Sequence, residues 1–119
     1  MKIFFAILGW VFGALFVVSA VVQYNDPDPW TWIFIYSVAA LVSFGFALGR
    51  ISFGVLLSLG IVALLGFFYT FPEKFEGFEI DGGDIKNIEE GREAFGLLII
   101  SIIMFIYALR TRYSRASKI

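Results

Sequence analysis

Four long apolar runs, separated by short polar segments, dominate the chain. They cover residues 3–22, 30–49, 51–71 and 94–109, and contain 20, 20, 21 and 16 residues. A helix needs about 20 apolar residues to cross the hydrocarbon core of a bilayer. Because none of the runs alternates with the two-residue period of a transmembrane strand, the pattern predicts helices rather than a barrel.

The runs predict an all-α integral membrane protein, a four-helix bundle that forms a single transmembrane domain over residues 1–119. We expect helices at about 3–24, 29–49, 51–71 and 88–110, joined by outer loops at 25–28 and 72–87. Hydrophobic residues make up 60% of the chain, and the mean hydropathy is +0.87. These values are too apolar for a water-soluble domain of this size. The first run is too long for a cleaved signal peptide, so we expect a retained span.

Charged residues divide between the two sides of the predicted bundle. One side has no acidic residue and six basic ones, namely Lys2, Arg50, Arg110, Arg112, Arg115 and Lys118. The other side has all ten acidic residues and three basic ones, giving a formal charge of −7. The positive-inside rule therefore predicts cytoplasmic termini and external acidic segments, in a multi-pass protein of the cell membrane.

The residue types that are missing exclude several kinds of chemistry. The chain has neither cysteine nor histidine, which removes disulfides, thiolate metal sites, histidine-ligated haem and the commonest general base. We expect no cofactor, and without a broad basic surface we expect no nucleic-acid binding. The expected partner is the lipid bilayer.

The small pairs Gly9–Gly13 and Gly54–Ser58 suit close helix packing, within one bundle, in a homo-oligomer or in a larger membrane complex.

Two polar motifs flank the predicted spans. The first, "QYNDPDPW", begins at Gln23, and the second, "NIEEGREAFG", begins at Asn87. Helix capping explains part of each motif, because Asp28 before Pro29 suits a helix start and Asn87 with Glu90 resembles a capping box. Capping does not explain the remaining polar residues, Gln23, Asn25, Asp26, Arg92 and Glu93.

Helical spacing indicates where these polar residues gather. At 100° per residue, three stripes each carry their polar members near the outer end: Gly9, Phe12, Phe16, Ser19 and Gln23; Trp32, Tyr36, Ala39 and Ser43; Glu89, Glu93, Gly96, Ile100 and Met104. We therefore predict a polar cluster at the outer mouth of the bundle, made of Gln23, Asn25, Asp26, Asp28, Trp32, Tyr36, Glu89, Arg92 and Glu93. In it, Arg92 would pair with Asp26 or Asp28, and Glu93 would hydrogen-bond Tyr36, Gln23 or Asn25.

The two motifs together resemble the transmembrane protein 220 family. The resemblance rests on Gln23, "NDPD" at residues 25–28, Trp32, Tyr36, and "EEGRE" at residues 89–93 with Gly96, and it covers nearly the whole chain. It implies a small four-helix membrane protein, and a fold rather than an activity.

Three functions remain open for the cluster. We favour a structural, accessory or lipid- or small-ligand-binding module, and we assign no catalytic residue. The alternatives are a divalent-cation site at Asp26, Asp28, Glu89 and Glu93, and a carboxylate-based membrane enzyme. The enzyme finds less support because the chain has no histidine, which the intramembrane peptidases with a similar Glu-Glu and Arg pattern also use. A channel is not supported, because the inner halves of the predicted helices lack acidic residues.

Overall fold

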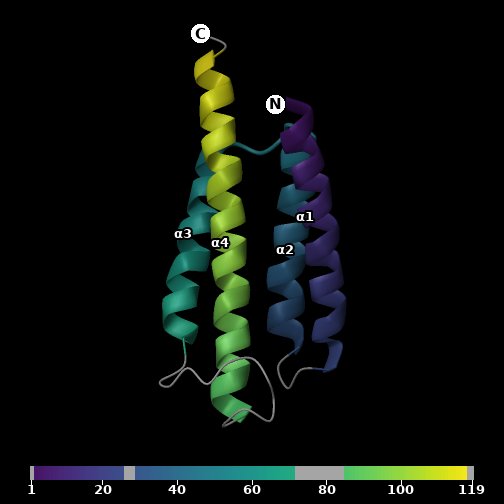
Figure 1. Ribbon diagram of the computed structural model, residues 1–119, viewed down its shortest axis with the longest axis vertical. Helices are drawn as coiled ribbons and strands as arrows, with labels where there is room; N and C mark the ends of the chain where they lie inside the picture. Colours follow the sequence, from purple (N-terminus) through teal and green to yellow (C-terminus); the bar gives the residue numbers. More distant parts are fainter. Residues whose placement is uncertain (1, 26–28, 72–84, 118–119) are drawn as a thin grey trace. The chain divides into compact units, whose positions relative to one another are not determined.

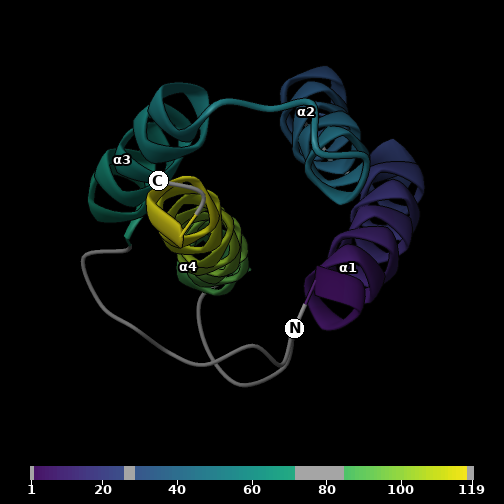
Figure 2. The ribbon, with the colours of Figure 1, turned by 90° about the horizontal axis from the view of Figure 1, so that it is seen from above.

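The structure is a computed structural model that describes the backbone of residues 2–25, 29–71 and 85–117. Within them lie the helices α1 (Lys2–Val22), α2 (Pro29–Ala47), α3 (Phe53–Thr70) and α4 (Ile85–Ser117), with a short 3-10 helix, η1 (Gln23–Asn25), after α1 (Figure 1). The chain forms two compact units, Met1–Ser52 and Phe53–Ile119. Each is a hairpin of two helices side by side, seen along the helices in Figure 2. We call them the first and the second hairpin.

All four α-helices are long and apolar enough to cross a membrane. The candidate spans are Lys2–Val22, Pro29–Ala47, Phe53–Thr70 and Glu90–Tyr113. The prediction of an all-α, multi-pass membrane protein is therefore confirmed. The association of the hairpins in one domain, the cytoplasmic termini, and a homo-oligomer or larger complex stay predictions.

The helix boundaries differ from the predicted ones mainly in α4. This helix extends over Ile85–Ser117 rather than 88–110. Asn87 is thus the third residue of the helix, and the predicted capping box at Asn87 is wrong. The extension past Leu109 shows that the helix continues where the apolar run stops, because arginine is a good helix former.

The end of α2 is set by Gly49, two residues after the last helical residue. Gly49 has a positive φ of 72°, a conformation that glycine adopts without steric cost. Its N–H donates to the carbonyl of Phe46 at 2.9 Å, and the N–H of Arg50 donates to the carbonyl of Gly45 at 2.9 Å. These two bonds form a Schellman motif, which satisfies carbonyl groups that the helix end would otherwise leave unpaired.

Glycine allows close approach of the two helices in the first hairpin. A Cβ atom at Gly9 would lie 2.9 Å from the backbone oxygen of Ser43, and the ring of Phe44 lies against Gly13. Phe16 of α1 and Ala39 of α2 are buried as well. The small pair of α1 therefore packs against α2 of the same chain, as expected for small residues in lipid.

The second hairpin is joined by a buried hydrogen bond. Ser101 Oγ of α4 donates to the carbonyl oxygen of Gly60 of α3 at 2.9 Å. The ring of Phe105 lies against Gly60, and Leu56 and Tyr107 are completely buried. The second small pair of the sequence, Gly54 and Ser58, has a different environment. Both residues are exposed on α3, and no atom outside the local backbone lies within 4 Å of a Cβ built at Gly54.

Replacing Ser101 by alanine tests the bond between α3 and α4. Interhelical hydrogen bonds in membranes contribute on average about 0.6 kcal/mol and at most about 1.7 kcal/mol. Since the carbonyl of Gly60 would lose a buried donor, we expect a loss toward the upper end of this range, measured by unfolding in mixed detergent micelles. The control is Ser19→Ala, because the bond that Ser19 Oγ makes among the described residues stays within its own helix, to the carbonyl of Leu15 at 2.9 Å. Equal stability of the two variants would contradict the contact.

Candidate functional site

The predicted polar cluster is described only in part. Asp26 and Asp28 lie outside the described residues, as do the side chains of Asn25 and Glu89. The predicted pairing of Arg92 with Asp26 or Asp28 involves residues outside the described part, so it stays a prediction.

Three members of the cluster lie in the first hairpin. Gln23 Nε2 donates to the carbonyl of Ser19 at 3.1 Å, one turn back in the helix. Trp32 is buried, and the ring centroid of Tyr36 lies 6.4 Å from that of Phe16 of α1. On the predicted stripe of α2, Ala39 and Ser43 are buried as well. The stripe therefore faces inward, as its polar residues indicate.

The other described members lie on α4, where Arg92 is exposed and Glu93 is half-buried next to the buried Ala94. The predicted hydrogen bond of Glu93 to Tyr36, Gln23 or Asn25 would join the two hairpins, and it stays a prediction. Among the residues that the structure describes, no group of three or more acidic residues is placed to hold a metal ion. The side chains of three of the four residues proposed for the cation site, Asp26, Asp28 and Glu89, lie outside the described part.

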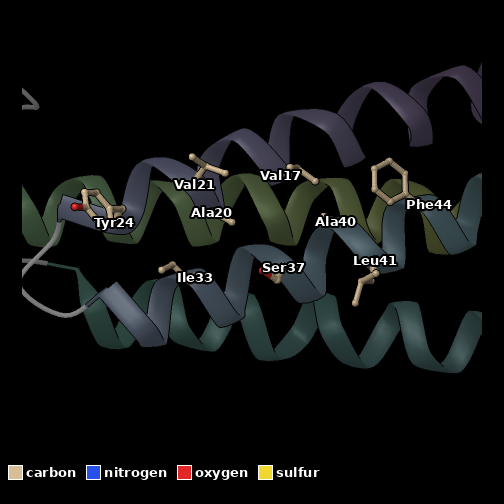
Figure 3. Close-up of a pocket in the computed structure, with 9 residues that line it drawn as sticks. All are labelled: Val17, Ala20, Val21, Tyr24, Ile33, Ser37, Ala40, Leu41 and Phe44. Carbon is tan, nitrogen blue, oxygen red and sulfur yellow. The ribbon is translucent and has the colours of Figure 1, made fainter.

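A groove between α1 and α2 was not predicted from the sequence. It has a volume of about 540 Å³ and is lined by Val17, Ala20, Val21, Tyr24, Ile33, Ser37, Ala40, Leu41 and Phe44 (Figure 3). The buried residues Ala20 and Ala40 form its floor, and Val17, Val21 and Leu41 are exposed at its sides. The groove is deep at these two positions because alanine side chains leave space that larger residues would fill.

The polar groups of the groove are two hydroxyls. Tyr24 lies at one end and Ser37 near the middle, while Phe44 lies at the other end (Figure 3). The rest of the lining is aliphatic or aromatic carbon. Such a surface suits an apolar ligand with a hydrogen-bonding group at one end.

Comparison with known proteins decides the family. The family described as "Transmembrane family 220, helix" matches residues 15–109, most of the chain. The chain belongs to this family. "Transmembrane protein 220" of Xenopus laevis is 32% identical over 107 residues, which are 80% of this chain and 53% of that protein. The chain thus spans about half the length of this relative. No solved structure matches the chain.

The match to family 220 confirms the resemblance inferred from the two polar motifs. The matched range includes all nine residues of the predicted cluster and all residues of the groove. The matched range ends before Arg110, so the basic end of α4 lies outside it. A sequence signal for the groove exists in retrospect. Ala20 and Ala40 are the small residues of two stripes with helical spacing, 17–20–21–24 and 33–37–40–41–44.

Proposed function

We propose that this chain is a membrane-embedded binding module that holds one acyl chain of a bilayer lipid in the groove between α1 and α2. The observation that carries the proposal is the groove itself, an apolar hollow of about 540 Å³ on two helices with the length and composition of membrane spans. In a bilayer the medium around these helices is hydrocarbon. An acyl chain is therefore the occupant available at the highest concentration.

The length of the groove agrees with one leaflet. From Ile33 to Phe44 the lining of α2 covers 11 residue steps, or about 16 Å at 1.5 Å per residue. This is about half of the roughly 30 Å hydrocarbon core of a bilayer. On α2, which covers Pro29–Ala47, this lining begins four residues after the helix start and ends three residues before the helix end. An acyl chain that entered at the Tyr24 end would thus reach past the middle of α2.

Aromatic residues indicate which end of the groove lies at the headgroups. Tyr24 follows the apolar run of α1, and Trp30 begins that of α2, and both side chains are exposed. Tyrosine and tryptophan favour the membrane–water interface, where the ring meets hydrocarbon and the polar atom meets water. The Tyr24 hydroxyl is therefore suited to donate to an ester or phosphate oxygen of the same lipid. With the orientation expected from the charges, the groove would face the outer leaflet of the cell membrane.

Packing energetics support a resident chain rather than an empty hollow. Atoms that line an unfilled space lose their dispersion contacts on that side. A saturated or unsaturated acyl chain can adapt to the shape set by Ala20, Ala40 and Ser37. Filling the groove restores these contacts, and so it stabilises both the lipid position and the α1–α2 pair.

Filling the groove with a protein side chain tests the proposal. We expect Ser37→Phe to reduce crosslinking of a phosphatidylcholine with a diazirine on its acyl chain to residues 17–44 several-fold, because the ring occupies the middle of the groove. The measurement is peptide mass spectrometry after irradiation of the full chain in nanodiscs.

The matched control is Ser58→Phe, which places the same ring on an exposed position of α3. It should crosslink like the unsubstituted chain. Equal crosslinking in the two variants would overturn the proposal. So would crosslinks from the groove to another protein chain in place of lipid, because a transmembrane helix would then be the occupant.

A further inference from the structure

The last helix continues past the membrane span as a basic segment. α4 has 33 residues, so it is about 50 Å long at 1.5 Å per residue. Its apolar span ends at Tyr113, while the helix ends at Ser117. Figure 1 shows this end extending beyond the start of α3. After Glu93 the chain has no further acidic residue, and the charged residues that follow are Arg110, Arg112, Arg115 and Lys118.

One of these arginines is held in place by the neighbouring helix. The guanidinium carbon of Arg112 lies 5.7 Å from the centre of the Phe53 ring, and Phe53 is the first residue of α3. A guanidinium over an aromatic face is attracted by the ring and still has N–H groups to offer to a second partner. Because the ring contact restricts the side chain, less entropy is lost when it binds an anion.

We propose that Arg110 and Arg112, at the end of α4 beside Phe53, bind the phosphate of anionic phospholipid headgroups. The site is independent of the groove, since it belongs to the second hairpin and recognises a headgroup rather than an acyl chain. Both residues lie in the last turn of the apolar span, which ends at Tyr113, and this is the level of the headgroup phosphates. The exposed ring of Tyr113 follows Arg112, and it suits the same interface.

Orientation during membrane insertion explains the positive charge but not its arrangement. The positive-inside rule acts equally on lysine and arginine, and it requires no fixed geometry. Three of the four basic residues after Leu109 are arginine, which binds phosphate through two parallel N–H groups. The contact between Arg112 and Phe53 adds a fixed position, which a headgroup site needs and an insertion signal does not.

The test compares charge removal on the two predicted sides of the membrane. The full protein is reconstituted in phosphatidylcholine with spin-labelled phosphatidylglycerol, and the immobilised fraction of the label gives the selectivity for the anionic lipid. A basic residue near a charged surface contributes about fivefold. We therefore expect the double variant Arg110→Gln, Arg112→Gln to lose most of the selectivity, and added salt to lower it in the unsubstituted chain.

The control is Lys74→Gln with Lys86→Gln, which removes the same charge between α3 and the polar motif of α4 and should keep the selectivity. Phe53→Leu keeps every charge and frees Arg112, so it should lower the selectivity less than the double substitution. If the double variant does not fold, Arg112→Lys serves in its place, because it keeps the charge and loses the paired N–H groups. Unchanged selectivity in the Arg112 and Phe53 variants, or an equal loss in the lysine control, would overturn the proposal.

Discussion

Valine in place of Gly9 is expected to force α1 and α2 apart. A Cβ at this position would lie 2.9 Å from the backbone oxygen of Ser43 and 3.0 Å from the Cβ of Ala47. Neither atom can rotate away, because one belongs to the backbone and the other is fixed directly to it. The aromatic rings that lie against Gly13 and Gly60 can still shift by rotation. Overpacking typically costs about 1–3 kcal/mol, and we expect the upper end at Gly9.

The control for Gly9→Val is Gly54→Val. Both substitutions replace a helical glycine by valine. Gly9 lies in the interior of α1 and Gly54 in the first turn of α3, and glycine is about 1 kcal/mol less favourable than alanine in a helix interior, so propensity alone favours valine at Gly9. A Cβ at Gly54 meets no atom outside the local backbone within 4 Å, and a lower stability of the Gly9→Val chain therefore reports the contact with α2. The measurement is thermal unfolding in detergent, followed by near-UV circular dichroism. A Gly9→Val chain as stable as the Gly54→Val chain would refute the described packing of α1 on α2.

Cysteine labelling is expected to give an all-or-none difference between the two sides of the membrane. The chain contains no cysteine, so Ser117→Cys and Gly83→Cys each provide a single thiol. In intact cells we expect an impermeant maleimide to label Gly83→Cys, and to label Ser117→Cys only after permeabilisation. The reason is the charge distribution, since the side with Ser117 has six basic and no acidic residues.

Leu48→Cys provides an internal check on the topology. Leu48 is exposed at the end of α2, so its thiol should behave like that of Ser117→Cys. Labelling of Ser117→Cys in intact cells would reverse the orientation. The basic end of α4 would then face the outer leaflet, away from the anionic lipids that give the cytoplasmic leaflet its negative potential. Such a result would argue against the headgroup site and leave the groove proposal intact, with the opposite leaflet as its source of lipid.

The sequence predicted the helices well because lipid imposes a simple requirement on each of them. A span must be apolar throughout, so residues 3–22 and 30–49 are visible without knowledge of any contact. The inward face of α2 was predicted for the same reason. In hydrocarbon, polar residues such as Ser43 face protein rather than lipid, and Ser43 is completely buried.

Features that depend on two helices at once were not predictable in this way. The groove exists because small residues of both helices, Ala20 of α1 and Ala40 of α2, come together in one lining, and this combination is absent from the periodicity of either helix. The bond from Ser101 to Gly60 likewise joins residues 41 positions apart. Of the polar cluster, Gln23, Trp32 and Tyr36 are placed in one hairpin, whereas Arg92 and Glu93 belong to the other. Whether they meet depends on how the hairpins associate, which no periodicity specifies.

The Schellman turn at Gly49 bears on how the chain is synthesised and inserted. It satisfies the last carbonyl groups of α2 with the N–H groups of Gly49 and Arg50 and uses no atom of α3. The packing of α1 against α2 likewise involves only residues before Ser52. A ribosome that has released the first hairpin has therefore delivered a pair of spans that can enter the bilayer and close on each other while α3 is still being made. The membrane insertion machinery would then receive the protein as two successive pairs rather than as four separate helices.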